Sequence, residues 1–206
     1  VDITNAVVGY DRVIDFDFVN FDFHNGGTGT DTIDYSGVTF ASGNVTINLA
    51  TAFTYVAGGN TERIFNFENV EGSQGGETII GTLDVNVING NDGDDIILAG
   101  QGNDTITGGA GDAYLNGTNF TAQGTRERDT LISGGLDDTD IFVLGERLGL
   151  AGRVFYNDLG NADYAILQDF DVYNFPGDIA DKIQLLGSAS NYRISNIMVD
   201  GISGAG

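Results

Sequence analysis

The stretch GNDGDDIILAGQGNDTITGGAGD, residues 90–112, decides the fold, because glycine, aspartate and one aliphatic residue recur in it every nine residues. Cutting the chain every nine residues from Gly72 gives GSQGGETII, GTLDVNVIN, GNDGDDIIL, AGQGNDTIT and GGAGDAYLN. Position eight is always aliphatic: Ile79, Ile88, Ile97, Ile106 and Leu115. Position six carries a side-chain oxygen in four of the five segments: Glu77, Asn86, Asp95 and Asp104, with Ala113 as the exception. Single turn-forming clusters are common, but five in one phase indicate a structural repeat.

The five segments resemble the nonapeptide G-G-x-G-x-D-x-U-x of RTX (repeats-in-toxin) proteins, which is a calcium-binding repeat. The resemblance covers residues 72–116. An outlying copy, GGTGTDTID, stands at residues 26–34 and has Asp31 and Ile33 in positions six and eight. The resemblance implies an all-β fold, namely a right-handed parallel β-roll (β-helix) of nonapeptide repeats with β-rich N- and C-terminal flanking or capping regions.

The spacing also has a physical meaning of its own. Six residues rich in Gly, Asn and Asp form a tight turn with positive-φ positions, and the last three form a short strand with one inward aliphatic side chain. Two such units close one coil of about 18 residues, and the strands of stacked coils pair at about 4.8 Å. Position-six carboxylates of successive coils then repel by about 3 kcal/mol at an effective dielectric constant of about 20. A divalent cation between them turns this repulsion into binding.

Calcium suits these ligands, because it accepts six to eight oxygens, including turn carbonyls, in a flexible geometry. Zinc prefers His or Cys, and this chain has His24 alone and no cysteine. We therefore expect several Ca²⁺ ions as the only cofactor.

The resemblance also implies ligand sets, since each ion in the family lies between turns two repeats apart. Carbonyls of positions two and four and the position-six acid come from one turn, and positions one and three with the acid come from the other. The first set is Ser73, Gly75 and Glu77 with Gly90, Asp92 and Asp95. The second set is Thr82, Asp84 and Asn86 with Ala99, Gln101 and Asp104, and it is weaker because Asn86 replaces an acid. The third set is Asn91, Gly93 and Asp95 with Gly108, Ala110 and Asp112, where Ala113 fills the slot of an acid.

The phase breaks after Asn116, and a seven-residue insertion restores it. Gly124, Arg126 and Asp129 then take positions one, three and six, with Leu131 in position eight, so that Asp129 faces Asp104. Gly100 and Gly102 are further candidate metal ligands of this set, and Asp31 is the candidate ligand of the outlying repeat. The stretch SGGLDDTDIFVLG, residues 133–145, resembles the degenerate repeat that closes such rolls, with either Asp138 or Asp140 as its acid.

The remaining chain is β-like but less regular, and we expect three parts. Residues 1–71 form a β-rich flank with the outlying repeat, residues 72–142 form the calcium-binding roll with an inserted loop near 117–128, and residues 143–206 form a β-rich cap over its open end. The alternation of RVIDFDFVNFDF, residues 12–23, slips by one at Val19 and predicts one strand with a bulge. NVTINLA, residues 44–50, predicts another strand.

Several polar residues outside the repeat have simpler expected roles. Asp15, Asp17 and Asp22 alternate with phenylalanines, so we expect them on the solvated face of a strand. His24 precedes the outlying repeat, and we expect it in a turn or at an edge.

Composition excludes several classes of protein. The 206 residues are 41% hydrophobic, which allows a real core. A net charge of −22 argues against nucleic acid or anionic membrane surfaces as partners. Of 30 acidic residues 24 are Asp, which favours turns and cation sites over helix, and no apolar run approaches a membrane span of about 20 residues. Because the chain starts at Val1 without a visible signal segment, we expect it to be processed or part of a longer protein.

The RTX resemblance implies a calcium-binding, hemolysin-type module of a secreted bacterial protein. Such a module leaves the cell by type I secretion, folds on binding Ca²⁺ outside or at the cell surface, and has a stabilising or adhesive role. We expect no enzyme activity, since the carboxylates are explained by the repeat and the chain has one His and one Lys. The alternative is a non-catalytic glycan-binding module, or part of a secreted carbohydrate-active enzyme or hydrolase whose catalytic domain lies elsewhere. Its partners would be polysaccharide or cell-surface components.

Overall fold

The structure is a computed structural model. It describes residues 3–6, 8–15, 21–39, 45–56, 61–118, 127–135, 138–148, 151–154, 156, 164–170 and 180–186. Regular structure in these ranges consists of β-strands alone, as the sequence predicted. The described residues contain no helix long and apolar enough to cross a membrane.

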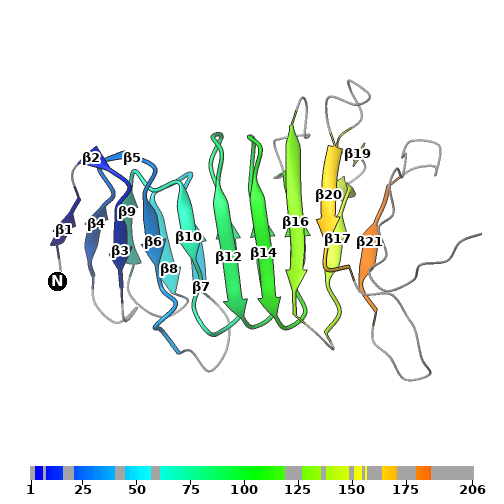
Figure 1. Cartoon of the computed structure of the whole chain (residues 1–206), viewed down its shortest axis with the longest axis horizontal. Coiled ribbons are helices and arrows are strands. Elements are labelled where there is room, and N and C mark those ends of the chain that lie inside the picture. Colours follow the sequence, from blue (N-terminus) through cyan, green and yellow to red (C-terminus); the bar gives the residue numbers. More distant parts are fainter. Residues whose placement is uncertain are drawn as a thin grey trace, which may run out of the picture.

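Most described strands belong to two long sheets that face each other across the core (Figure 1). Sheet 1 has the order β1 (Ile3–Asn5), β4 (Phe23–Asn25), β9 (Thr61–Phe65), β8 (Phe53–Val56), β7 (Val45–Asn48), β11 (Glu77–Ile80), β13 (Ile96–Leu98), β15 (Tyr114–Asn116), β17 (Ile141–Val143) and β21 (Lys182–Gln184). Sheet 2 has the order β3 (Arg12–Ile14), β6 (Thr32–Asp34), β10 (Asn69–Glu71), β12 (Val87–Asp92), β14 (Thr105–Ala110), β16 (Arg128–Gly134) and β20 (Tyr164–Gln168). The chain alternates between the sheets and thereby winds into stacked coils.

Two small pairs complete the described strands. β2 (Val8–Gly9) and β5 (Thr28–Gly29) are parallel, whereas β18 (Gly145–Leu148) and β19 (Ala151–Val154) form an antiparallel hairpin. Within sheet 1, β7, β8 and β9 are antiparallel neighbours, and the expected strand at residues 44–50 is β7.

Successive coils of the repeat are in parallel register at the predicted spacing. Ile79 pairs with Ile97 and Ile97 with Leu115 in sheet 1, while Ile88 pairs with Ile106 in sheet 2. The insertion after Asn116 is confirmed as well, because Leu131 pairs with Ile106. The core is the resulting stack of position-eight side chains, all buried: Ile33, Ile79, Ile88, Ile97, Ile106, Leu115 and Leu131. Burying each such side chain contributes about 1.5–3 kcal/mol.

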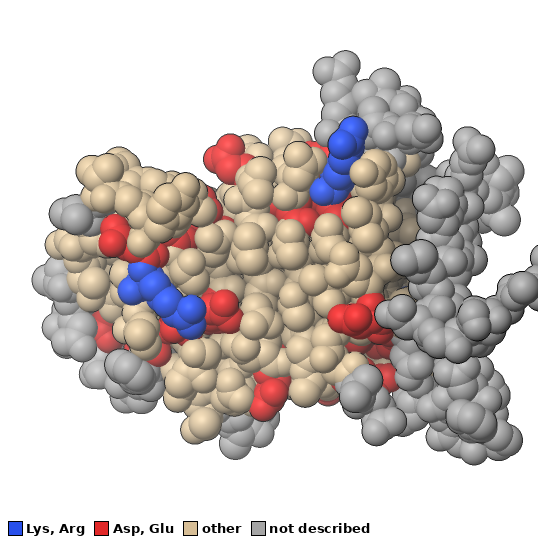
Figure 2. Space-filling model, in the orientation of Figure 1, with Lys and Arg blue, Asp and Glu red and all other residues tan. Residues whose placement is uncertain are grey.

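The turns between strands require glycine at defined places. Position two of the turn before Tyr114 is Gly109, whose φ is 103°. A Cβ at Gly109 would lie 1.7 Å from the carbonyl oxygen of Asn91 in the neighbouring coil, so both the backbone angle and the close approach exclude a side chain. Figure 2 shows acidic groups mostly toward the margins of the visible face, where the turns are, and a largely uncharged middle.

Parallel strand pairing continues beyond residue 142, the expected end of the roll. β20 pairs in parallel with β16, and β21 with β17, so both strands extend the two sheets. The separations in sequence are 36 residues for Arg128 and Tyr164 and 41 for Ile141 and Lys182, both longer than the 18 residues of a regular coil, and the strands still pair. The division of the chain at residues 71 and 142 stays a prediction, and most of the loop near 117–128 lies outside the described residues.

Two further expectations for the N-terminal residues were wrong. The two ends of the stretch 12–23 form β3 and the start of β4, which belong to different sheets, so it is not a single bulged strand. Asp15, Asp22 and His24 are buried instead of solvated or at an edge. Asp15 follows β3 of sheet 2 and His24 lies on β4 of sheet 1, so side chains from both sheets meet in the interior. Asp17 lies outside the described residues.

Candidate metal centres

The position-six residues form two columns along the stack of coils, one at the start of the strands of each sheet. The sheet 1 column contains Glu77, Asp95, Ala113, Asp140 and Asp181. The sheet 2 column contains Asp11, Asp31, Glu68, Asn86, Asp104 and Asp129. Most of these side chains are buried, although the residues are polar. We call them the position-six columns.

Within each column, one carboxylate oxygen joins neighbouring coils. The amide N–H of Glu77 donates to Asp95 Oδ1 at 2.7 Å, and the amide of Asp104 donates to Asp129 Oδ1 at 2.8 Å. The same bond joins Asp11 to Asp31, Asn86 to Asp104, Ala113 to Asp140 and Asp140 to Asp181, at 2.8–2.9 Å. Glu68 makes the same bond with its longer side chain, since its Oε2 accepts the Asp31 N–H at 2.8 Å.

The second carboxylate oxygen has no such role. The Oδ2 atoms of Asp31, Asp95, Asp104 and Asp140 are buried and have no hydrogen-bond partner among the described residues. Burying a charged oxygen without a partner costs several kcal/mol. Repetition of this cost along both columns indicates that a cation belongs there.

Position-one glycines add carbonyl oxygens to the same places. A Cβ on Gly90 would lie 2.2 Å from Asp95 Oδ2 and 2.5 Å from the carbonyl oxygen of Gly108. A Cβ on Gly81 would lie 2.5 Å from Asn86 Oδ1 and 2.1 Å from the carbonyl oxygen of Ala99. At Gly81 and Gly90 the column side chain and a carbonyl of the next coil therefore flank a space that a side chain would fill. Carboxylate and carbonyl oxygens are the ligand set of Ca²⁺.

Burial changes the protonation of these acids in the absence of a cation. It raises the pKa of Asp95 and of Asp104 to about 8, and that of Glu77 and of Asp140 to about 7. Desolvation disfavours the charged form of a carboxyl group, and a bound cation would favour it again. The pKa of Asp129 rises less, to about 6, because the Tyr156 hydroxyl donates to its Oδ2 atom and partly offsets desolvation.

The structure brings together the acids of the first predicted set. Glu77 and Asp95 are adjacent in the sheet 1 column, and the Ser73 hydroxyl and N–H donate to Glu77. Gly75 lies in the same turn, where its N–H donates to the Ser73 hydroxyl. Gly90 flanks Asp95 as described, and the side chain of Asp92 is exposed.

The second predicted set is arranged differently. Asn86 neighbours Asp104, but its Oδ1 accepts the Thr82 N–H at 2.7 Å and its Nδ2 donates to the Glu68 carbonyl oxygen at 2.6 Å. Asp84 and Gln101 are exposed, and the Gln101 N–H donates to the Thr82 carbonyl oxygen. This set therefore offers one unpartnered carboxylate oxygen, that of Asp104.

The third set has one acid in the column, Asp95, and lacks the second. Asp112 is exposed and accepts the Thr139 N–H at 2.8 Å, while Ala113 occupies the buried slot beside it. Asn91 pairs with Gly109 and Asp92 with Ala110, next to Gly93 and Gly108. In the fourth set Asp129 meets Asp104 as predicted, with Gly100 and Gly102 in the turn before Asp104, whereas Gly124 and Arg126 lie outside the described residues.

Asp140, and not Asp138, takes the column slot of the closing repeat, since its Oδ1 accepts the Ala113 N–H at 2.8 Å. Asp138 accepts the Gly111 N–H at 3.1 Å. One carboxylate oxygen each of Asp138, Asp140 and Asp181 lies within 4.8 Å of the others. Sequence reasoning missed Asp181, Glu68 and Asp11 as column members. The signal was an acid two residues before a strand aliphatic: Asp181 before Ile183, Glu68 before Val70 and Asp11 before Val13.

Comparison with known families supports the repeat. Residues 71–106 and 94–119 match the family model of the RTX calcium-binding nonapeptide repeat, with four copies. The comparison with curated proteins found no match.

Proposed function

We propose that this chain, which carries RTX calcium-binding nonapeptide repeats, is a module that is ordered by Ca²⁺ along both position-six columns and acts outside the bacterial cell. The repeat supports calcium binding as such. The observation that carries the proposal is the set of buried, unpartnered Oδ2 atoms on Asp31, Asp95, Asp104 and Asp140. In each of these residues Oδ1 already accepts an N–H of the neighbouring coil, so Oδ2 is available to an ion.

The strongest candidate centre lies between Glu77 and Asp95. Ser73 and Gly75 from one turn and Gly90 and Asp92 from the other would add backbone carbonyls, and the bound ion would neutralise the two acids. A second centre would use Asp104 with Asp129, and a third would use Asp140 with Asp138 and Asp181. Asn86 and Ala113 hold position six in place of an acid, so the centres that include these positions should bind Ca²⁺ more weakly.

Calcium binding on this scale would decide whether the chain folds. Each site at a hundredfold excess of Ca²⁺ over its Kd adds about 2.7 kcal/mol to the free energy of unfolding. Two or three sites would therefore match the 5–15 kcal/mol by which domains are normally stable. With a net charge of −22, the chain repels itself when calcium is scarce.

This balance suits a protein that is exported unfolded and folds outside. Scarce calcium inside the cell would leave the chain open for type I secretion, and a calcium-rich exterior would fold it into a stabilising or adhesive module. Support comes from the repeat family, the acidic composition and the buried carboxylates, which are costly without a cation.

Calorimetric titration of the full chain with Ca²⁺ tests the assignment of the sites. We expect several ions per chain, and we expect Asp104→Asn to lose at least one of them. Asp169→Asn, which removes the charge of an exposed side chain that belongs to neither column, is the matched control and should bind as the parent does. An unchanged stoichiometry in Asp104→Asn would refute its place in a calcium centre.

A further inference from the structure

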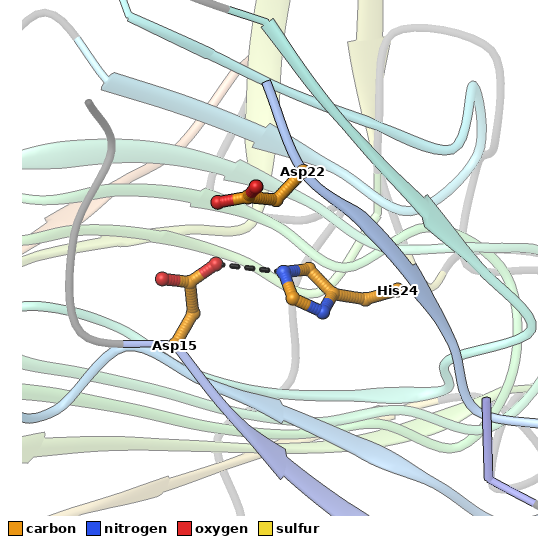
Figure 3. A group of neighbouring side chains, drawn as sticks. All are labelled: Asp15, Asp22 and His24. Atoms are coloured by element: carbon orange, nitrogen blue, oxygen red, sulfur yellow. Dashed lines mark hydrogen bonds and ion pairs between the residues drawn. The ribbon is translucent and has the colours of Figure 1, made fainter. Parts of the chain in front are cut away.

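The first coils hold a polar cluster where later coils hold aliphatic side chains. His24 lies on β4 in register with Ile64 of β9, so its imidazole occupies a position-eight place in the core. Asp22 lies two residues earlier and points to the same side of the strand. Asp15 follows β3 in the opposite sheet. Figure 3 shows the imidazole and the two carboxylates converging across the interior.

The three side chains are close and almost fully buried. Asp15, Asp22 and His24 are 7%, 3% and 3% exposed, and one ligand atom from each lies within 4.8 Å of the others. His24 Nε2 lies 2.8 Å from Asp15 Oδ2. The other ring nitrogen, Nδ1, is buried and has no hydrogen-bond partner among the described residues. The ring nitrogen that faces the carboxylates is therefore Nε2, and it is the atom that the cluster offers to an ion.

We propose that Asp15, Asp22 and His24 are the protein ligands of a divalent transition-metal ion, for which Zn²⁺ is the probe. Imidazole nitrogen with two carboxylate oxygens is a ligand set that zinc accepts, with a fourth position left for water. Calcium prefers six to eight oxygens and gains little from a nitrogen. This site thus differs in chemistry from the position-six columns and lies outside the repeat.

The surrounding charges favour a cation at this place. An imidazolium would bring one positive charge to two carboxylates, and Glu62, also buried, lies in the same part of the interior and accepts the Tyr35 hydroxyl at 2.9 Å. The arginines of these coils are engaged elsewhere. Arg12 pairs with Asp34 at 2.7 Å, and Arg63 lies over the rings of Phe53 and Phe65.

Only a small movement would admit the ion. Two ligands of a tetrahedral zinc ion lie about 3.3 Å apart, given metal–ligand distances of about 2.0–2.1 Å. His24 Nε2 and Asp15 Oδ2, at 2.8 Å, would separate by a fraction of an ångström. β3, which precedes Asp15, pairs with β6, and β4, which carries His24, pairs with β9, so strand pairing positions both ligands before an ion binds.

The test uses the full chain saturated with Ca²⁺, so that the columns are filled before Zn²⁺ is added. His24 is the only histidine of the chain, and its imidazole therefore gives a single set of ring resonances in a nitrogen-detected NMR spectrum. We expect one equivalent of Zn²⁺ to shift these resonances, in slow exchange, in the unmodified chain. Ring resonances that do not respond to Zn²⁺ would overturn the proposal without any question of misfolding.

Variants then test the two carboxylates. Asp15→Asn and Asp22→Asn should each weaken Zn²⁺ binding at least tenfold in competition with a chromophoric chelator, while Asp169→Asn should not. Circular dichroism and the Ca²⁺ midpoint of each variant must match the parent before its Zn²⁺ affinity is compared. Equal Zn²⁺ affinity in folded Asp15→Asn, Asp22→Asn and parent chains would show that the ion binds only to scattered surface carboxylates, and the proposed site would be wrong.

Discussion

At the scale of single residues, the two oxygens of a position-six carboxylate have separate roles. Oδ1 accepts an amide from the neighbouring coil and belongs to the fold, whereas Oδ2 is buried and available to an ion. Glycine at position one keeps the space beside that oxygen open. The identity of position six therefore decides both coil stacking and ion binding.

Asp95 gives the sharpest mutational test of this division. Asp95→Asn keeps an oxygen for the Glu77 N–H but loses the charge, so we expect a loss of about 3 kcal/mol in the free energy of unfolding in Ca²⁺ and little loss without it. Asp84→Asn, at an exposed side chain, should change neither value by more than about 0.5 kcal/mol. Denaturant unfolding in both conditions measures this. Equal losses for the two variants would show that position six is wrongly assigned as the source of the carboxylate ligands.

Tyr156 provides a second test, because its hydroxyl gives Asp129 Oδ2 the hydrogen bond that the Oδ2 atoms of Asp95, Asp104 and Asp140 lack among the described residues. Tyr156→Phe leaves Asp129 Oδ2 without its donor, which should destabilise the calcium-free chain by about 1–3 kcal/mol. In Ca²⁺ we expect a smaller loss, since an ion can replace the hydroxyl as the partner of Asp129. Thermal unfolding with and without Ca²⁺ compares the two, and a larger loss in Ca²⁺ would instead make Tyr156 part of the centre.

At the scale of elements, the half-coil is a turn with fixed backbone angles followed by a short strand. Asn91 and Gly93 have φ of 73° and 111°, and Gly109 and Gly111 have 103° and 117°, so positions two and four take left-handed conformations in successive coils. The turns thus depend on glycine or asparagine at two places, while the strands depend on one aliphatic residue.

Gly109→Ala should therefore be far more harmful than its size suggests. The new Cβ would meet the Asn91 carbonyl oxygen at a backbone angle that alanine avoids, and we expect a loss of about 3 kcal/mol or more in Ca²⁺. Ala99→Gly, at position one of the preceding repeat, should cost only about 1 kcal/mol. Chemical denaturation of both variants checks this, and similar losses would mean that the turns are not rigid.

The sequence predicted the strands that are connected by turns of constant length. Position-six and position-eight residues from Glu77 to Leu115 repeat without interruption, and one insertion of seven residues still allowed Asp129 and Leu131 to be placed. β20 and β21 were missed as coils, because loops of variable length separate them from their partners and long-range pairing leaves no local pattern. His24 was misplaced for a related reason, since a crossing between sheets is not visible in the alternation of residues 12–23.

At the scale of the whole molecule, acid burial and net charge couple folding to pH as well as to calcium. The folded calcium-free chain raises the pKa of Asp95 and Asp104 from 3.8 to about 8 and that of Glu77 from 4.5 to about 7. Between the ordinary and the raised pKa values, the folded calcium-free chain therefore binds more protons than the unfolded chain. Its free energy of unfolding falls as pH rises through this range. Calcium replaces the protons, so its affinity should rise over the same range.

We accordingly expect the melting temperature in calcium-free buffer to fall between about pH 5 and pH 8, where the raised pKa values of these acids lie. In saturating Ca²⁺ the melting temperature should be nearly constant above about pH 6, where calcium displaces the protons. Differential scanning calorimetry at a series of pH values, with and without Ca²⁺, measures both curves. A calcium-free chain that becomes more stable as pH rises would contradict the assignment of these acids as buried.

The central claim is that the cation, and not the polypeptide alone, stabilises this stack of coils. Circular dichroism of the full chain, followed from excess chelator to millimolar Ca²⁺ and back, tests it most directly. The account predicts a weaker strand signal and a much lower melting temperature in chelator, a large gain of both in Ca²⁺, and full reversal when chelator is restored. Strand signal and melting temperature that are the same in chelator and in millimolar Ca²⁺ would contradict it.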